Sequence, residues 1–398
     1  MTARLAAVVS LVAALSAAAL ADAGPPISIG QIHTLKSAVL GEERTVMIHL
    51  PPGYEAGVQR YPVLYLTDAE AQFGHTVSTA DFLAVQGRIP ALIVVAIRNT
   101  ERTRDLTPTK GSLTEGGKAV PFPKAGGADR FLAFIGTELV PYVEKNFRTV
   151  PYRAFAGHSF GGLFALHALL TRPELFQATL AVSPTFNWDS DYIMRLAGPF
   201  FAEKKEARHA LFVAIGDEPE LGPGFRALRA LAPTGAAEDF EATYREYPDD
   251  DHGSLVLAAH HDGLRALFAD WVLPRDTQTG FPRGTAEEIA AQFARLSKTV
   301  GFTVIPPERV VNLAGYGRLA ERKVPQALAI FEMNAKSYPE SANVWDSLGD
   351  GLEAAGRLAD AKTAVLKAVA LGGKNGDPLL PAFREHLEKL NARLEGGK

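Results

Sequence analysis

Residues 153–170 read R-A-F-A-G-H-S-F-G-G-L-F-A-L-H-A-L-L. A short strand-like run, Arg153–Ala156, precedes the pentapeptide G-H-S-F-G at 157–161, and a helical pattern, Phe160–Leu170, follows it. In a G-x-S-x-G pattern the serine sits on a tight strand-to-helix turn, where bulky side chains two residues to either side would clash. The stretch therefore predicts a strand–turn–helix unit that presents Ser159 as a nucleophile.

Short apolar runs and amphipathic helical stretches alternate on both sides of this unit. Runs of this kind are typical of strands buried in a mostly parallel sheet. The alternation predicts an α/β fold with one doubly wound sheet, whose active site lies at the carboxyl ends of the strands. A helical stretch, Asp129–Asn146, contains Pro141, which should bend it. The predicted strands are Thr45–Leu50, Tyr61–Leu66, Ala91–Ile97, Ala154–Gly157, Ala178–Ser183 and Leu211–Gly216.

The segment Arg102–Gly127 is rich in Gly, Pro, Thr and Lys. So long a structureless stretch inside a compact domain is usually functional or mobile. We interpret it as a loop beside the site, and a surface insertion is the alternative.

A serine becomes a good nucleophile only when a base removes its proton, and the expected chain order is serine, acid, histidine. His252 fits the base because it lies in a polar loop between the strand-like Glu241–Tyr247 and a helix. His209, before a strand, and His260 and His261, inside the helix, fit less well.

The acid should follow the strand-like Leu211–Gly216, where three carboxylates crowd one loop. Such a carboxylate fixes the tautomer of the histidine and stabilises its charged form. Glu218 is preferred, and Glu220 and Asp217 stay open as alternatives.

The tight turn should also place the backbone N–H of Phe160 at a helix N-terminus, where it can donate to an oxyanion. A second donor is expected from the loop 67–70, and Asp68 in that loop is interpreted as a turn residue. Phe186 and Trp188 follow a strand end, where they either line an acyl pocket or simply pack in the core.

The character of the chain changes after Pro274. Residues 276–308 are interpreted as a linker and a connecting helix, Ala286–Leu296, with Thr285 and Glu288 as its capping box. Residues 309–398 show a period of 34, in which Gly315, Ala327 and Phe331 correspond to Gly349, Ala361 and Val365. This pattern resembles tetratricopeptide repeats, an all-α module that offers a possible surface for a protein partner. Because two copies are fewer than independent stability requires, we expect the module to pack on the preceding domain, 24–275.

Composition excludes several other functions. The chain has 398 residues, of which 47% are hydrophobic, and no cysteine, so a thiol nucleophile and disulfides are excluded. A formal charge of −4 predicts no nucleic acid partner. Neither a metal-ligand motif nor a phosphate-binding loop appears in the sequence, so we expect no metal and no cofactor.

Residues 1–23 read as a signal peptide. Arg4 precedes an apolar stretch, Leu5–Leu20, and small residues at 19, 21 and 23 offer cleavage sites. The chain is therefore expected to be exported, to the periplasm or outside the cell. The mature chain should not span a membrane, because no later segment is long and apolar enough.

Several motifs together resemble the esterase family that includes enterochelin esterases, feruloyl esterases, S-formylglutathione hydrolase and the mycolyltransferases. They are P-P-G-Y at 51–54, Y-P-V-L-Y-L-T-D at 61–68, R-T-R-D-L-T-P at 102–108, G-H-S-F-G-G at 157–162, S-P at 183–184 and D-H-G-S at 251–254. The resemblance implies an α/β-hydrolase fold with Ser159 as nucleophile, His252 as base, and the N–H groups of Phe160 and Glu70 as the oxyanion hole.

The predicted function is hydrolysis of a small-molecule or conjugated carboxylic ester through an acyl-enzyme intermediate. One rival is an acyltransferase that uses the same triad with an alcohol acceptor. The other is a non-catalytic protein whose hydrolase domain is a scaffold for the helical repeats. The identity of the ester stays open.

Overall fold

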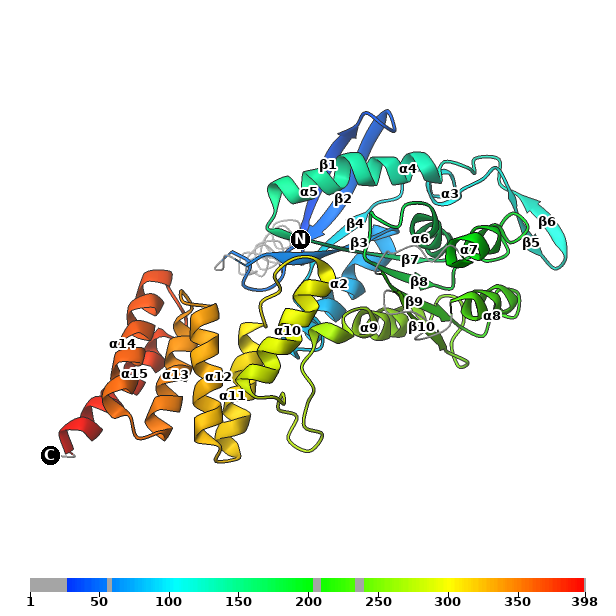
Figure 1. Ribbon diagram of the computed structural model, residues 1–398. Helices are drawn as coiled ribbons and strands as arrows, with labels where there is room; N and C mark the ends of the chain where they lie inside the picture. Colours follow the sequence, from blue (N-terminus) through cyan, green and yellow to red (C-terminus); the bar gives the residue numbers. More distant parts are fainter. Residues whose placement is uncertain (1–26, 56–58, 203–208, 233–239, 397–398) are drawn as a thin grey trace, which may run out of the picture.

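A computed structural model describes residues 27–55, 59–202, 209–232 and 240–396, and the predicted signal peptide lies outside these ranges. The described chain contains an eight-stranded sheet with helices on both faces (Figure 1). The first two strands are antiparallel to their neighbours and all other pairs are parallel, which confirms the predicted fold class. In spatial order the strands are β1 (Gln31–Ser37), β2 (Glu42–His49), β4 (Ile93–Ile97), β3 (Tyr61–Leu66), β7 (Thr149–His158), β8 (Ala178–Val182), β9 (His209–Ile215) and β10 (Phe240–Glu246).

Apolar side chains fill both faces of the central strands. In β3, Val63 and Tyr65 belong to one core, and Leu64 and Leu66 belong to the other, because successive strand residues point to opposite faces. Figure 1 shows α4 and α5 above the sheet, and α2 and α9 below it. The first core includes α4 (Ala128–Phe134), α5 (Val140–Asn146), α6 (Phe160–Thr171), α7 (Tyr192–Ala202) and α8 (Gly222–Leu231); the second includes α2 (Ala69–Val85), α9 (Val256–Leu267), the 3-10 turn η2 (Ala269–Trp271) and α10 (Ala286–Val300).

The helix predicted over 129–146 is present, with an irregularity before the proline. Residues Ile135–Leu139 (η1) form a π-helical segment between α4 and α5. Pro141 follows at the start of α5. Because proline has no N–H to donate to the carbonyl one turn earlier, the regular hydrogen-bond pattern is interrupted in this region.

The segment 102–127 is not the structureless loop that its composition predicts. It contains the short helix α3 (Arg102–Leu106) and a hairpin of β5 (Ser112–Glu115) and β6 (Lys118–Pro121). Gly116 and Gly117 both have positive φ, which is the backbone that a two-residue hairpin turn requires. The Gly-Gly pair was the available signal for this hairpin.

The strand register brings the predicted site residues to one edge of the sheet. Leu66 of β3 pairs with Ala156 of β7, and His158 of β7 pairs with Val182 of β8. Val182 in turn pairs with Ala214, near the end of β9. The loops that carry Asp68, Ser159, Ser183 and Glu218 therefore leave the sheet side by side.

The C-terminal region consists of successive packed helices. The predicted 34-residue equivalences hold in space, since a Cβ at Gly315 would lie 2.5 Å from the Phe331 ring and one at Gly349 2.4 Å from Val365. Each glycine thus allows the two helices of its pair to approach closely. The helices are α11 (Glu308–Ala320), α12 (Val324–Ser337), α13 (Ala342–Ala354), α14 (Leu358–Asn375) and α15 (Leu380–Gly396).

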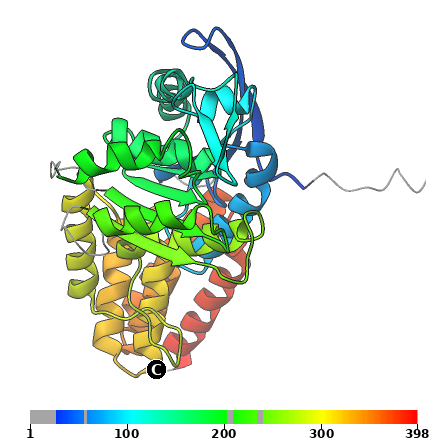
Figure 2. The ribbon, with the colours of Figure 1, turned by 90° about the vertical axis from the view of Figure 1, so that its right-hand side faces the viewer.

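This helical module packs on the preceding domain, as its two copies predict. Val310 and Val311 of α11 share a hydrophobic core with Ile289 of α10 and with the sheet. Helix α10 begins with the predicted capping box, in which Thr285 and Glu288 bond each other's backbone N–H. Figure 2 shows the helical module lying beyond one end of the sheet.

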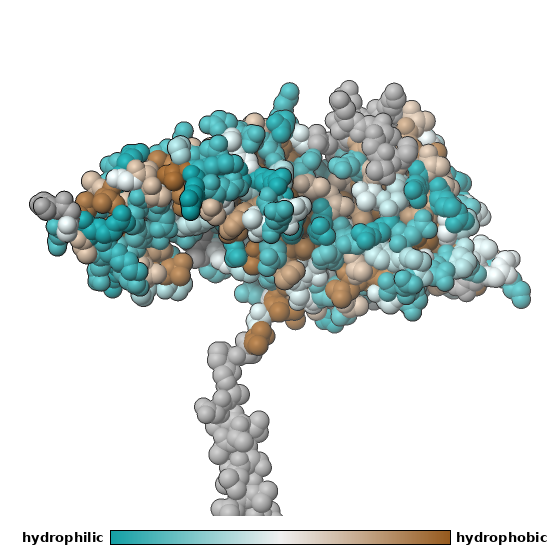
Figure 3. Space-filling model, turned by 90° about the horizontal axis from the view of Figure 1, so that it is seen from below, coloured by the Kyte–Doolittle hydropathy of each residue, from teal (hydrophilic) through white to brown (hydrophobic). Residues whose placement is uncertain are grey.

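On the face seen in Figure 3, hydrophobic residues are scattered among hydrophilic ones. Among the described residues, no helix combines the length and hydrophobicity that crossing a bilayer requires.

Candidate active site

Ser159 lies at the sharp turn between β7 and α6. Its backbone has φ 61° and ψ −118°, a conformation that is rare for a residue with a side chain. A Cβ at Gly157 would lie 2.1 Å from the carbonyl oxygen of Gly161, and one at Gly161 would lie 2.4 Å from Oγ1 of Thr67. The predicted steric need for both glycines is therefore confirmed.

His252 and Glu218 meet although they lie on different loops. His252 Nδ1 is hydrogen-bonded to Oε1 of Glu218. The other carboxylate oxygen, Oε2, accepts from the hydroxyl of Ser183 and from the backbone N–H of Gly216 at 3.0 Å. Burial by itself raises the pKa of Glu218, but the bonds from His252, Ser183 and Gly216 together hold that pKa below its ordinary value. The carboxylate is thus kept ionised beside the imidazole.

The two alternative carboxylates contact other parts of the molecule. Glu220 accepts from the backbone N–H of Gly116 at 3.1 Å, in the β5–β6 hairpin. Asp217 is exposed, and its backbone N–H donates to the carbonyl of Asp250. Among the three carboxylates predicted for this loop, the structure brings Glu218 to His252.

Ser159 and His252 lie at the same edge of the sheet. Nε2 of His158, the neighbour of Ser159, is 2.7 Å from the carbonyl oxygen of His252, and the two imidazole rings are 4.6 Å apart. Among the described residues, no hydrogen bond joins the Ser159 hydroxyl to the His252 ring. Such bonds are often long in the absence of substrate, so the arrangement is compatible with a serine–base pair.

The two predicted oxyanion donors lie at neighbouring helix N-termini. Phe160 is the first residue of α6, and Glu70 is the second residue of α2. Backbone N–H groups in the first turn of a helix have no acceptor within the helix, so both are available to a ligand. A Cβ at Gly161 would lie 3.2 Å from Oδ2 of Asp68, which shows how closely the two turns approach. The side chain of Glu70 accepts a hydrogen bond from Nε of Arg98, so only its backbone N–H is assigned to the oxyanion.

Arg102 is a site residue to which the sequence assigned no role of its own. Its Nε donates to Oδ1 of Asp68 at 2.6 Å, and its Nη2 donates to the carbonyl of His158 at 3.3 Å. It therefore links the turn before α2 to the turn that carries Ser159. The R-T-R-D-L-T-P motif at 102–108 contains Arg102 and was the available signal for this role. The segment was interpreted as a loop because only its composition was considered.

Phe186 and Trp188 are ordinary core residues. Both are essentially inaccessible to solvent. Trp188 packs against Phe160 and Phe122, with ring centroids 5.5 and 5.6 Å apart. Trp188 therefore supports the turn at Ser159 through Phe160, and neither side chain lines an open pocket.

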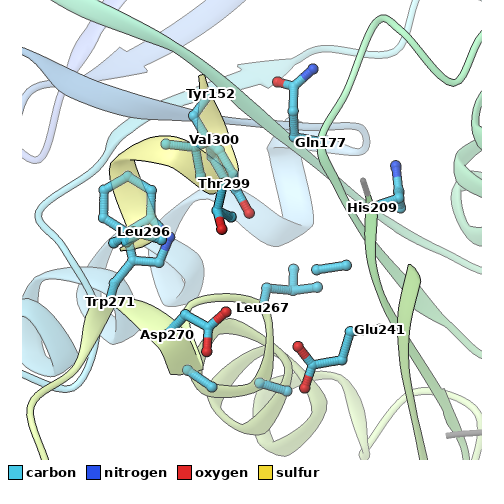
Figure 4. Close-up of a pocket in the computed structure, with 13 residues that line it drawn as sticks. Tyr152, Gln177, His209, Glu241, Leu267, Asp270, Trp271, Leu296, Thr299 and Val300 are labelled. Carbon is cyan, nitrogen blue, oxygen red and sulfur yellow. The ribbon is translucent and has the colours of Figure 1, made fainter. Parts of the chain in front are cut away.

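A cavity of about 220 Å³ lies at the opposite edge of the sheet (Figure 4). Gln177, His209 and Glu241 line it, at or just before the amino ends of β8, β9 and β10. Trp271 and Thr299 close its other side. Because Ser159 and His252 lie at the carboxyl ends of the strands, this cavity is not the site described above.

Comparisons with known proteins identify the family of the chain. The model of a family described as "Putative esterase" matches residues 37–244. The ferri-bacillibactin esterase BesA of Bacillus subtilis is 36% identical over 234 residues, which cover 53% of this chain and 80% of that protein. The siderophore triacetylfusarinine C esterase of Aspergillus fumigatus is 30% identical over 272 residues, which cover 58% of this chain and 90% of that protein.

Two solved structures extend the likeness to the fold. An IroE-like serine hydrolase from Shewanella oneidensis aligns with TM-score 0.68 at 30% identity, over 77% of this chain and 99% of that one. An uncharacterised protein from Capnocytophaga ochracea aligns with TM-score 0.59 over 91% of this chain and 100% of that one. At 18% identity the second likeness concerns the fold alone.

Proposed function

The chain belongs to this esterase family and is a carboxylic ester hydrolase, and we propose that it works through an acyl-enzyme intermediate on Ser159. The observation that carries the proposal is the contact between His252 and Glu218 at the edge of the sheet that also presents Ser159. A serine, an imidazole and a carboxylate that are hydrogen-bonded in that order perform acyl transfer on several unrelated folds.

The carboxylate determines the tautomer of the base in this mechanism. Because Glu218 accepts a hydrogen bond from Nδ1 of His252, that nitrogen carries the proton and Nε2 keeps its lone pair. Nε2 takes the proton of the Ser159 hydroxyl as its oxygen attacks the ester carbonyl. The resulting imidazolium is stabilised by the ionised Glu218 and returns the proton to the leaving alcohol. Water then repeats the sequence on the acyl-enzyme and releases the acid.

The oxyanion of each tetrahedral intermediate is assigned to the backbone N–H groups of Phe160 and Glu70. Both groups are fixed by their helices before substrate arrives, so they need no reorganisation during the reaction. Losing one such donor costs about 3–4 kcal/mol in the transition state.

A siderophore ester is the substrate class proposed for the first test, because two of the relatives are named as siderophore esterases. Export of the chain and a protein partner for the helical module are further parts of the proposal, based on residues 1–23 and on the repeat pattern.

The experiment combines a panel of chromogenic esters of varied acyl length, a ferri-siderophore ester and a fluorophosphonate probe. We expect hydrolysis and covalent labelling by the native chain, and neither by Ser159→Ala. Ser78→Ala, which changes an exposed serine on α2, is the matched control and should behave as the native chain. Hydrolysis retained by Ser159→Ala would exclude the proposed nucleophile.

A further inference from the structure

The loop that carries His252 contacts the turn that carries Ser159 through one side chain. His158 Nε2 and the carbonyl oxygen of His252 are 2.7 Å apart. Among the hydrogen bonds of the described residues, no other joins residues 157–161 to residues 249–255. The distance between nucleophile and base is therefore set from this side by His158.

The loop is well ordered within itself and is anchored on its far side. Oδ1 of Asp251 accepts from the backbone N–H groups of Gly253 and Ser254, at 2.9 and 2.8 Å. The carbonyl of Asp250 accepts from the N–H of Asp217, in the loop that carries Glu218. These contacts fix the shape of the loop and its distance from Glu218, and none of them is made to residues 157–161.

The chemistry of the contact determines the state of the His158 ring. A carbonyl oxygen only accepts, so Nε2 of His158 must carry the hydrogen. Burial, followed by the nearby charge of His252, lowers the pKa of His158 to about 4. The ring is therefore a neutral donor at neutral pH. A cation in its place would oppose the proton that His252 gains in each half-reaction, because the rings are 4.6 Å apart.

The backbone of the same residue is held from the opposite side. Its carbonyl accepts from Nη2 of Arg102, whose Nε is bonded to Asp68 in the turn before α2. Residue 158 thus contacts both the loop of the proposed base and the arginine that supports the proposed oxyanion turn.

We infer that His158 is a positioning residue, whose neutral Nε2–H holds the His252 loop at the distance from Ser159 that proton transfer requires. The inference rests on the proposed function. It concerns a side chain whose hydrogen bond goes to the backbone of His252, not to the Ser159 hydroxyl or the His252 ring nitrogens, and it predicts an effect on turnover rather than on substrate binding.

The test compares two variants of His158 with one control. His158→Leu keeps the bulk of the side chain and removes the donor, and His158→Gln supplies an amide N–H at similar reach. The control, His261→Leu, changes a partly exposed histidine of α9 that pairs with Asp262. Each variant is assayed for kcat, KM, thermal midpoint and the rate of fluorophosphonate labelling of Ser159.

We expect His158→Leu to lower kcat and the labelling rate by about 30- to 100-fold, the effect of misplacing a catalytic group by about 1 Å. KM should stay within about threefold, because a contact that only positions the base does not contribute to binding of the substrate in its ground state. His158→Gln should recover at least tenfold of the loss, and His261→Leu should match the native chain.

Three results would overturn the inference. They are a kcat for His158→Leu within twofold of the native value, a failure of His158→Gln to recover activity when both variants are folded, and a loss that appears in KM alone. A failure of the proposed function looks different, because the probe would then not label Ser159 in the native chain.

Discussion

Two histidine–carboxylate pairs in this chain have very different surroundings. In the hydrolase domain, Nδ1 of His252 contacts Glu218, and among the described residues Nε2 of His252 has no hydrogen bond. In the helical module, Nδ1 of His386 on α15 contacts Asp346 on α13 at 2.8 Å. Nε2 of that ring faces Glu353 at 3.2 Å and Asp350 at 3.7 Å. An imidazole paired with a carboxylate therefore has one nitrogen without a hydrogen bond in one place and is enclosed by carboxylates in the other.

The difference shows that the second ring nitrogen decides what a paired histidine can do. The hydrogen bond that Asp346 accepts from His386 raises the pKa of His386, against the lowering effect of burial. The carboxylates of α13 thus favour the charged form of this ring, which links α15 to α13. His252 keeps a nitrogen that can take a proton, and it lies next to a strained serine turn. We expect four effects, from the largest to the smallest, of which three compare the two regions and the fourth concerns the helical module.

The first prediction concerns the replacement of His252 or His386 by alanine. His252→Ala should lower kcat by about 10⁴-fold or more, because the serine loses its base. His386→Ala should leave kcat within about twofold, since its ring is enclosed by carboxylates of the helical module. Steady-state hydrolysis of a chromogenic ester measures both. Equal losses in the two variants would remove the distinction between the pairs.

The second prediction removes the charge of each carboxylate partner. Glu218→Gln should lower kcat by about 10²- to 10⁴-fold, because an amide no longer fixes the tautomer or stabilises the imidazolium. Asp346→Asn should leave kcat unchanged and lower only the thermal midpoint. Glu220→Gln and Asp217→Asn serve as neighbouring controls. A larger loss in either control than in Glu218→Gln would reassign the acid.

The third prediction compares one glycine from each region. A Cβ at Gly157 would meet backbone, the Gly161 carbonyl at 2.1 Å, whereas one at Gly349 would meet the end of the Val365 side chain at 2.4 Å. A side chain can rotate away and a backbone turn cannot. Gly157→Ala should therefore cost about 3 kcal/mol or more of unfolding free energy and abolish activity, and Gly349→Ala about 1–2 kcal/mol. Urea unfolding and the ester assay compare them, and a milder effect at 157 would contradict this account of the turn.

The fourth prediction concerns pH and the helical module. The folded-state pKa of His386 lies above 6.5, so its ion pairs stabilise the fold fully below the unfolded pKa. That stabilisation is lost as pH rises through the folded pKa. Because the side chains are partly exposed, the thermal midpoint should fall by only about 1 °C over this window. Scanning calorimetry from pH 5.5 to 8.5 should show the decrease in the native chain and not in His386→Gln. An equal pH response in both would assign it elsewhere.

Features that depend on residues close together in the chain could be predicted from the sequence. The strand–turn–helix unit at Ser159 was predictable from its local pattern, and the contact that requires Gly157 is made only four residues away, with Gly161. The contact that requires Gly161 is made with the distant Thr67 and became visible only in the structure. Six strands of the sheet were predictable from their apolar runs, and the capping box of α10 from two residues three apart. The edge strand β1, which is mostly exposed and has no apolar run, was not predicted. The repeat equivalences were predictable because each glycine packs against a residue 16 positions later in both copies.

Which of Asp217, Glu218 and Glu220 pairs with His252 could not be predicted from local sequence. All three lie within five residues of the end of β9 and carry the same charge, so no local pattern separates them. The turn after Gly216 points one of them at His252, one at a hairpin and one into solvent. The β5–β6 hairpin was not predicted, because the glycines of its turn were interpreted as part of a Gly-rich loop.

The sequence by itself thus determined the fold class, the strained turn at Ser159 and the place of His252 after the last strand of the sheet, since periodicity, steric contacts and chain order are written along the chain. Only the tertiary structure decided which carboxylate meets His252, that Arg102 joins two turns, and that His158 holds a loop 94 residues away. The physical reason is that hydrogen bonds between distant loops depend on the directions in which side chains leave the backbone, and packing fixes these directions only when the whole sheet has formed.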